Sequence, residues 1–408
     1  MNERSHDSLF LHADGDSFFV ACELSQNPEY DGLPVVVGED RGIAVAMSPE
    51  AKKLGVTRGM PVFQIKKEFP SVIILPHHFD LYRKISDGVY ATLLSYLDRV
   101  EIYSIDECFA EVKMSDVRFF GSEKKLAMAI QHEIWQTFGV TYSIGIARTK
   151  ALAKTASKLN KPSGVVILLN EFEEHEALKK TDVEDVWGIG RRTSPRLIQM
   201  GIHTAHDFIM YSSDHIERFF SEPLRVLQLE LSGQSIHLIA SCTDPRDQQS
   251  IQSTSTFRPP SNDPRIIWSE LSDNAEHACA RARELRLLTR SVSFFVKTTE
   301  FVHHFADAKL PVFTTDPGVV LNALEPYLST VLVRGERIRS TGIILHALLR
   351  EEDVPRDLFG RQDSAFAQLV IEKVADAVRT KFGRGALMRA SSQKVSVHER
   401  GNSFPKRG

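Results

Sequence analysis

Two short acidic turns, each beside an apolar strand-like run, constrain this chain more than any other feature of its sequence. The run Leu9–Ala13 ends at Asp14-Gly15-Asp16, and Val100–Val112 has the pattern of strand, turn and strand around Ser104–Glu107. Successive residues of a regular strand face opposite sides, so neighbouring acids can face one site only where the chain turns. We therefore predict that both turns supply one carboxylate cluster, formed by Asp14, Asp106 and Glu107.

This predicted cluster indicates a metal site. Like charges held together cost free energy unless a cation neutralises them. Carboxylate oxygens are hard ligands, and a cluster without histidine or thiol suits Mg²⁺. A pair of such ions is typical of phosphoryl and nucleotidyl transfer. The competing interpretation is a turn aspartate that only hydrogen-bonds its own backbone, and the recurrence of the acidic turn weighs against it.

The rest of the chain predicts several folded parts. A length of 408 residues corresponds to about three domains, and 42% hydrophobic with 25% charged residues excludes a disordered chain. Strands and helices alternate up to about residue 168, and helices alone are expected from Glu171 to Ser232. The order β-α-β-β-α-β follows from Ser253 to Leu348. We therefore expect an α+β multidomain protein.

Charge and hydropathy exclude some classes of protein. The 50 basic and 53 acidic residues give a net charge of -3, so nucleic-acid binding must come from local patches. The clearest basic patch begins at Arg379, where a solvated tail is an equally good interpretation. No stretch approaches the ~18 apolar residues of a membrane span, and the N-terminus lacks a signal-peptide pattern. Four widely spaced cysteines suggest neither a disulfide framework nor a zinc site, so we expect a cytoplasmic protein without membrane association.

Several motifs resemble those of one protein family. They are His12–Phe19, Tyr103–Phe109, Lys161–Gly164 and Val186–Arg192. In this order and spacing they are similar to motifs of the Y-family translesion DNA polymerases, in the branch of bacterial DNA polymerase IV and UmuC. The resemblance implies a right-hand polymerase with palm, small fingers, a helical thumb containing a helix-hairpin-helix, and a β-α-β-β-α-β little finger. The implied parts are residues 1–168 for the palm with fingers at about 23–75, 169–240 for the thumb, 241–350 for the little finger and 351–408 for a tail with a clamp-binding peptide.

The activity implied by the resemblance is template-directed, Mg²⁺-dependent addition of deoxynucleotides to a primer 3′-end, as low-fidelity translesion synthesis without proofreading. Asp14, Asp106 and Glu107 would hold two Mg²⁺ ions, with the backbone carbonyl of Gly15 as a further ligand. Two alternatives stay open: a non-catalytic DNA- and clamp-binding protein that retains the fold, and another palm-type transferase such as a nucleotidyl cyclase. The intact set of carboxylates disfavours the first alternative, and Phe19 disfavours the second.

The family register also implies how the nucleotide is held. Phe19 would lie under the incoming sugar and exclude a 2′-hydroxyl, because packing an extra group against a rigid ring costs about 1 to 3 kcal/mol. Phe18 would belong to the core. Lys52 and Lys161 would bind the triphosphate. Pro49 and Lys52 stand where many relatives have tyrosine and arginine, so a bidentate phosphate contact is lost.

Three further polar residues near these motifs have simpler interpretations. Asp16 matches a variable acidic position, and we expect a turn or helix-capping residue there. Lys150 and Lys154 are expected on a solvated helix face.

The helical part carries a candidate DNA contact. Gly188 and Gly190 would let backbone N–H groups approach DNA phosphates, and Arg191 and Arg192 add positive charge. Such contacts position a duplex without reading its sequence. The scattered basic residues of the following region are by default solvated charges, namely Arg258, Lys297 and Arg339.

Two apolar residues, Leu358 and Phe359, lie in a polar segment that has no core of its own. Exposed anchors of this kind usually bind a partner. Their position resembles the sliding-clamp-binding peptide of bacterial relatives, without its usual leading glutamine. The expected partners are thus primer-template DNA, a dNTP and a sliding clamp, for a chain that acts as a monomer.

Overall fold

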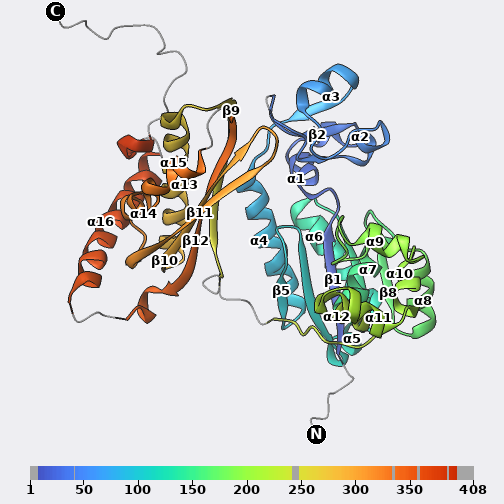
Figure 1. Ribbon diagram of the computed structural model, residues 1–408. Helices are drawn as coiled ribbons and strands as arrows, with labels where there is room; N and C mark the ends of the chain where they lie inside the picture. Colours follow the sequence, from blue (N-terminus) through green and yellow to red (C-terminus); the bar gives the residue numbers. More distant parts are fainter. Residues whose placement is uncertain are drawn as a thin grey trace, which may run out of the picture. The chain divides into compact units, whose positions relative to one another are not determined.

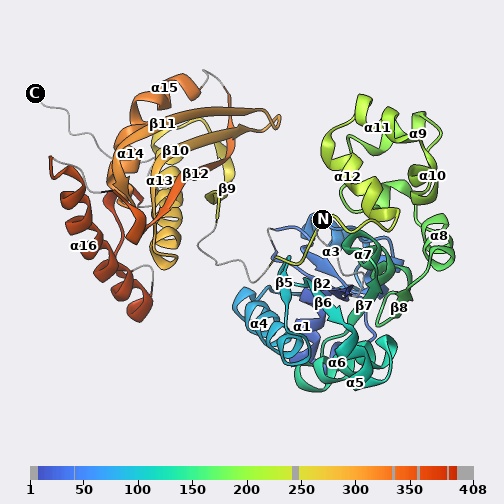
Figure 2. The ribbon, with the colours of Figure 1, turned by 90° about the horizontal axis from the view of Figure 1, so that it is seen from below.

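The computed structural model describes residues 8–40, 42–240, 248–332, 336–355, 359–383 and 386–392. The chain divides into two compact units, Met1–Cys242 and Thr243–Gly408 (Figures 1 and 2). Among the helices of the described residues, none is both long and apolar enough to cross a membrane.

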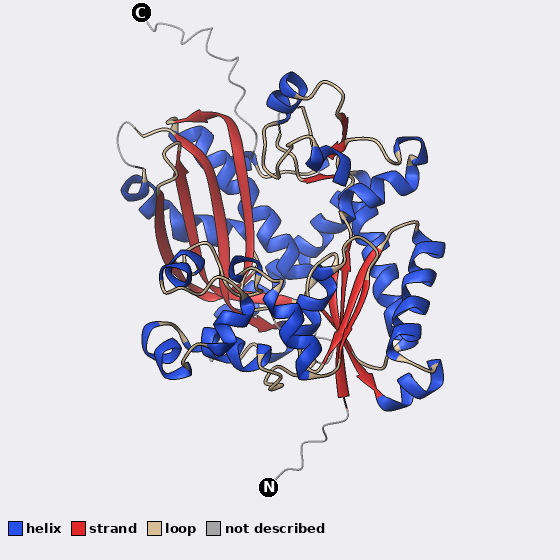
Figure 3. Cartoon of the chain, turned by 90° about the vertical axis from the view of Figure 1, so that its right-hand side faces the viewer, coloured by secondary structure: helices blue, strands red, loops and turns tan. Residues whose placement is uncertain are grey.

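The first unit is built on a five-stranded sheet in the order β5-β6-β1-β7-β8, with helices on both sides of it (Figure 3). All neighbouring strands are antiparallel except β7 and β8. The strands are β1 (Ser8–Gly15), β5 (Val100–Ile102), β6 (Glu107–Lys113), β7 (Tyr142–Ala147) and β8 (Val165–Leu168). The helices that join or cover them are α1 (Phe18–Gln26), α4 (Phe79–Tyr96), α5 (Met114–Phe120), α6 (Glu123–Phe138) and α7 (Lys150–Leu159).

The alternation of side chains along β1 divides two cores. Leu11 and Ala13 pack with α4 and α6 on one face, whereas Phe10 packs with α7 on the other. Helix α7 lies very close to the sheet, since a Cβ at Gly145 of β7 would come within 2.1 Å of the Ala153 carbonyl oxygen. A glycine is therefore required at residue 145, and the helix face opposite it is buried.

A small three-stranded sheet with the order β3-β2-β4 follows α1 in the chain. Its strands are β2 (Val35–Val37), β3 (Ala46–Met47) and β4 (Ile73–Leu75), and its helices are α2 (Pro49–Lys53) and α3 (Val62–Glu68). Helix α2 begins at Pro49, because the Ser48 hydroxyl accepts a hydrogen bond from the backbone N–H of Ala51 and Pro49 suits the first helical position.

The expected all-helical region is confirmed between residues 171 and 231. Its helices are α8 (Glu171–Lys179), α9 (Ser194–Gln199), α10 (Ala205–Met210), α11 (Ser213–Phe219) and α12 (Glu222–Leu231). They share one apolar core with α7. The fully buried Glu230 also fastens this region to α7, because its carboxylate accepts hydrogen bonds from the backbone N–H groups of Ala151, Ile236 and His237.

The second unit has the predicted β-α-β-β-α-β order. Its elements are β9 (Ile251–Ser261), α13 (Pro264–Glu284), β10 (Leu287–Thr298), β11 (His303–Thr314), α14 (Pro317–Leu324) and β12 (Ile338–Arg350). The antiparallel sheet has the order β11-β10-β12-β9, so a strand of each β-α-β segment lies between the strands of the other.

Both helices of the β-α-β-β-α-β order end at clear breaks in the chain. Helix α13 ends at Glu284, where the chain turns through Arg286 at a φ of 53° and enters β10. Helix α14 ends at Leu324 because Pro326 lacks a backbone N–H, and a short helix follows as α15 (Leu328–Val331). Single 3₁₀ turns occur at Pro28–Tyr30, Val183–Asp185, Glu325–Tyr327, Glu351–Asp353 and Ala390–Ser392.

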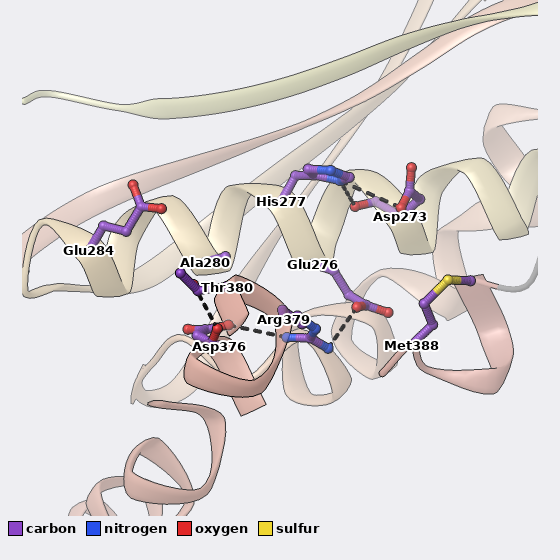
Figure 4. A pocket seen from close by; sticks show the side chains of 9 residues that line it. All are labelled: Asp273, Glu276, His277, Ala280, Glu284, Asp376, Arg379, Thr380 and Met388. Atoms are coloured by element: carbon purple, nitrogen blue, oxygen red, sulfur yellow. Dashed lines mark hydrogen bonds and ion pairs between the residues drawn. The ribbon is translucent and has the colours of Figure 1, made fainter. Parts of the chain in front are cut away.

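A long helix, α16 (Arg361–Phe382), lies in the segment 351–408, which was expected to be a tail. Ion pairs fasten it to α13 around a hollow of about 250 Å³ (Figure 4): Arg379 lies 2.9 Å from Glu276 of α13, and Asp376 lies 2.5 Å from Arg283 of α13. Within α16, Arg379 also lies 3.1 Å from Asp376. Arg389 pairs with Asp316 at 2.7 Å. The solvated-tail interpretation of the basic patch is therefore wrong for Arg379 and Arg389, whereas Arg384 and residues 393–408 lie outside the described residues.

Candidate active site

The two acidic turns meet at one end of the sheet. Asp14 of β1 lies opposite Glu107 of β6 in the antiparallel register, and the backbone N–H of Gly15 donates to the Asp106 carbonyl at 2.9 Å. One carboxylate oxygen from each of Asp14 and Glu107 and one ring nitrogen of His12 lie within 4.8 Å of one another. The structure thus brings Asp14 and Glu107 together, while Asp106 lies in the same turn as Glu107 and lines the adjoining hollow.

The charge on Asp14 is costly in this position. The residue is only 7% exposed, and burial raises the pKa of its carboxyl group to about 6, with a smaller contribution from the charges of Glu107 and Asp106. The Lys161 ammonium opposes this shift in pKa, because its Nζ lies 2.5 Å from Asp14 Oδ1. The site therefore has a strong electrostatic preference for added positive charge.

Sequence reasoning missed His12, which adds a nitrogen beside a cluster predicted to contain only carboxylates. The side chain is fully buried, and its Nδ1 lies 2.7 Å from Ser157 Oγ. Burial, followed by the charges of nearby lysines, lowers the pKa of the imidazole well below its usual value, so the ring is neutral at pH 7. The sequence feature that could have identified His12 is the alternation of side chains along a strand, because residues 12 and 14 lie on the same face of β1.

Two lysines of α7 contradict the expected solvated helix face. Lys150 and Lys154 are each only 5% exposed, because the side of α7 that carries them packs against the sheet. Lys154 Nζ lies 2.5 Å from Glu107 Oε2, and Lys150 Nζ lies 2.6 Å from Glu101 Oε1. Each ammonium therefore neutralises a carboxylate from the β5–β6 segment.

A hollow of about 550 Å³ opens beside the cluster, lined by Gly15, Phe19, Lys52, Arg58 and Asp106 among others. The half-buried Phe19 stacks on Tyr82 with ring centroids 4.5 Å apart, whereas Phe18 is 3% exposed in the core. A neighbouring hollow has both Lys52 and Lys161 in its lining. Arg58 was missed because its sequence context, a glycine-containing turn, gives no sign of a binding role.

Asp16 lies in the turn between β1 and α1, as expected, and its side chain also links two other segments. It is 8% exposed, and its carboxylate accepts hydrogen bonds from Ser143 Oγ and from the backbone N–H of Ser163, both at 2.8 Å. It does not cap α1, whose first residue follows Ser17 without a side-chain capping bond. Asp16 instead holds the loop that carries Lys161 against the sheet.

The glycine-containing hairpin of the helical region is attached to the second acidic turn. Gly188 and Gly190 are exposed, as are Arg191 and Arg192, and Gly188 has a φ of 92°. The half-buried Trp187 precedes them, and its Nε1–H donates to the Tyr103 hydroxyl at 2.9 Å. The exposed glycines and arginines therefore present backbone and positive charge, while Trp187 attaches the hairpin to the second acidic turn.

The remaining predicted contacts are described only in part. Phe359 is 85% exposed, while Leu358 lies outside the described residues. The side chains of Lys297 and Arg339 both lie over the Phe301 ring, at 4.9 and 4.5 Å from its centroid, and the side chain of Arg258 is not described.

Comparisons with known proteins agree with this geometry. Residues 13–158 match the impB/mucB/samB family, and residues 248–358 match the C-terminal domain of the same family. A DNA polymerase IV of Methanoculleus marisnigri is 32% identical over 352 residues, which cover 83% of this chain and 94% of the relative. Protein UmuC of Salmonella typhimurium is 30% identical over 397 residues, 93% of this chain and 92% of that protein.

Solved structures show the same fold. A Y-family DNA polymerase chimera of Dbh and Dpo4 matches 84% of this chain and 99% of its own, with a TM-score of 0.72 and 22% identity. An insertion ternary complex of Dbh DNA polymerase matches with the same coverage, a TM-score of 0.57 and 23% identity. The chain belongs to the Y family of translesion DNA polymerases. The resemblance and the right-hand fold class are confirmed, and no comparison favours the non-catalytic alternative.

Proposed function

We propose that the acidic cluster and the adjacent hollow form the site at which this polymerase adds a dNTP to the 3′-end of a primer-template DNA. One observation carries the proposal: carboxylates from two separate turns, Asp14 and Glu107, lie together beside a hollow that Asp106, Phe19 and Lys52 line. The implied division is a palm at 1–168 with inserted fingers, a thumb at 169–240, a little finger at 241–350 and a C-terminal segment thereafter.

The donor set of the cluster fits Mg²⁺. Asp14, Asp106 and Glu107 supply hard oxygen ligands, and burial has raised the pKa of Asp14 in a way that a bound dication would reverse. These residues, with the Gly15 carbonyl, would hold two Mg²⁺ ions. Bound there, the ions would activate the primer hydroxyl and neutralise charge on the triphosphate.

Two lysines beside the hollow, Lys161 and Lys52, bind the triphosphate in this proposal. The Lys161 side chain is 32% exposed and reaches the hollow that Lys52 also lines, so its ammonium can leave Asp14 and bind a phosphate. Lys52 approaches the same space from α2. Both act as point charges, in keeping with the absence of an arginine at residue 52.

Phe19 sets the sugar specificity in this proposal. Its ring is backed by Tyr82, with an interplanar angle of 16°, so it cannot withdraw from a ribose 2′-hydroxyl without losing that stack. A 2′-hydroxyl would therefore clash with the Phe19 ring, which Tyr82 holds in place, and deoxynucleotides are the preferred substrates.

Two further contacts belong to the same proposal. The exposed tip formed by Gly188 and Gly190, with Arg191 and Arg192, binds DNA phosphates through backbone N–H groups and positive charge. Leu358 and Phe359 bind a sliding clamp that keeps the monomeric enzyme on its template, supported by the 85% exposure of Phe359.

The decisive experiment is primer extension with Mg²⁺ and each dNTP, comparing the wild type with Asp106→Ala. Asp87→Ala, which removes an exposed acid of α4, is the matched control. We expect extension by the wild type and the control and none by Asp106→Ala. A wild type that binds primer-template tightly and extends nothing would overturn the proposal.

A further inference from the structure

The ammonium of Lys154 is enclosed by three aromatic rings and a carboxylate, and the proposed mechanism gives this lysine no role. Its ammonium lies 4.4 Å from the centroid of the Tyr103 ring, 5.4 Å from that of Trp187 and 6.0 Å from that of Phe109. The same ammonium lies 2.5 Å from Glu107 Oε2, and the side chain is 6% exposed. We call these three rings and the lysine the aromatic cage.

The cage makes Lys154 different from Lys161, the other lysine bound to the acidic cluster. Lys161 borders an open hollow and can exchange Asp14 for a phosphate. Lys154 has aromatic rings around its ammonium, and each ring attracts the cation electrostatically. Lys154 therefore holds one carboxylate oxygen of Glu107, Oε2, in a fixed position.

The cage also joins the proposed DNA contact to the acidic cluster. Trp187 directly precedes the hairpin glycines, and its ring meets Tyr103 with centroids 5.6 Å apart and planes at 89°. The Trp187 Nε1–H to Tyr103 hydroxyl bond fixes that arrangement. Tyr103 lies four residues before Glu107, and its backbone N–H donates to the Glu107 carbonyl at 3.0 Å. A shift of the hairpin must therefore change the surroundings of Lys154.

We propose that Lys154 is a positioning residue that fixes Glu107 as a one-oxygen metal ligand, and that Trp187 makes this fixation depend on the thumb hairpin. Binding of a DNA phosphate at the hairpin and binding of metal at the cluster are then coupled, each strengthening the other. This inference rests on the proposed function, because it takes Glu107 to be a metal ligand and the hairpin to bind DNA.

A purely structural role for the cage is the alternative, and the chain offers a matched control. Lys150 lies one helical turn before Lys154, is equally buried, pairs with a carboxylate and lies 4.6 Å from the Phe109 ring centroid. Its partner is Glu101, which is outside the cluster. Loss of either lysine removes a buried cation, but only Lys154 contacts Glu107.

The test measures Mn²⁺ binding by electron paramagnetic resonance on the full chain, alone and with a primer-template whose primer is chain-terminated. Mn²⁺ shares the preference of Mg²⁺ for oxygen ligands. We expect Lys154→Met to weaken Mn²⁺ binding about 10- to 100-fold, as loss of an outer-shell partner does. Lys150→Met should leave the affinity unchanged, and Lys154→Arg should restore most of it because the cation is kept.

The hairpin link has its own readout, which is the gain in Mn²⁺ affinity on adding the primer-template. Trp187→Leu should reduce that gain, whereas Trp187→Phe keeps a ring in the cage and should retain most of it. Phe172→Leu, which changes an aromatic side chain that is 76% exposed on α8, is the control. Thermal unfolding of every variant checks that it is folded.

The possible failures are distinguishable. Equal Mn²⁺ affinities for Lys154→Met and Lys150→Met would overturn the positioning role even if the wild type extends primers. An unchanged gain in Trp187→Leu would overturn the coupling. A wild type whose Mn²⁺ affinity depends on Lys154 but which extends no primer would overturn the proposed function and leave the inference about Lys154 standing.

Discussion

Asp14 and Glu107 are directly opposed residues of the antiparallel strands β1 and β6, so two acids far apart in sequence are neighbours across one ladder. Directly opposed like charges destabilise a sheet. Here each acid has its own lysine, Lys161 for Asp14 and Lys154 for Glu107. The two carboxylates therefore repel each other. The lysines offset this repulsion in the free protein, and a bound metal ion can relieve it.

This repulsion and the burial of Asp14 predict a pH dependence of stability. The pKa of Asp14 is raised from 3.8 to about 6, so between these values the folded protein holds a proton that the unfolded chain has released. The contribution of this group to the free energy of unfolding therefore falls as pH rises through that window and is constant above it. Asp14→Asn should accordingly raise metal-free stability at pH 7 by about 1 to 3 kcal/mol, while abolishing primer extension.

Urea unfolding of the wild type and Asp14→Asn from pH 4.5 to 7.5, with a chelator present, measures this difference. The advantage of Asp14→Asn should grow up to about pH 6 and then level off. The same advantage at every pH would contradict the raised pKa. Mn²⁺ should also bind the wild type more weakly below pH 6, because protons then compete for Asp14.

Phe19→Ala should open the enzyme to ribonucleotides. Removing the ring that Tyr82 supports removes an overpacking penalty of about 1 to 3 kcal/mol, which corresponds to a roughly 5- to 150-fold rise in relative kcat/KM for an rNTP. Single-nucleotide incorporation with each dNTP and its matching rNTP measures this ratio. Phe63→Ala is the control, because that ring is 70% exposed on α3. An unchanged ratio in Phe19→Ala would assign sugar discrimination to another residue.

Lys161→Met and Lys52→Met should weaken nucleotide binding. A hydrogen bond to a charged group contributes about 1.5 to 3 kcal/mol, so KM for the dNTP should rise at least roughly tenfold. Lys53→Met, which removes an exposed charge next to Lys52, should leave KM unchanged. Steady-state extension of a fixed primer-template at varied dNTP concentration provides the values. A KM shift shared by all three variants would point to general electrostatic attraction instead.

The sequence allowed much of this site to be predicted, because its signals are local. Strand runs that end in acidic turns identified Asp14, Asp106 and Glu107, and helical periodicity separated Phe18 from Phe19. The family register, by contrast, was needed to choose which of the two rings faces the nucleotide.

The unpredicted parts depend on partners that are distant in sequence. The sequence of α7 alone indicates solvated lysines, because their partners Glu101 and Glu107 come from β5 and β6, which are distant in sequence. Helix α16 escaped prediction for the same reason, since its charged residues Asp376 and Arg379 pair with acids and bases of α13, about a hundred positions earlier in the chain.

The attachment of α16 makes Arg283 the residue on which the second unit should depend most. Its side chain is 2% exposed, and its guanidinium donates to both carboxylate oxygens of Asp376, at 2.5 and 2.8 Å, and to the Thr315 carbonyl at 2.7 Å. Arg283→Met removes a buried guanidinium and leaves Asp376 with Arg379 as its remaining cation, and breaking a buried pair costs up to about 3 to 5 kcal/mol. Arg281→Met, on the same helix, removes a pair with Glu284 in which the two side chains are 46% and 63% exposed, and should cost less than about 1 kcal/mol. Thermal unfolding of the full chain measures the loss of stability in each variant, and limited proteolysis shows whether the loss is located at α16. Equal unfolding temperatures for both variants would mean that α16 is held by its apolar contacts with Leu288 and Val354 and not by this ion pair.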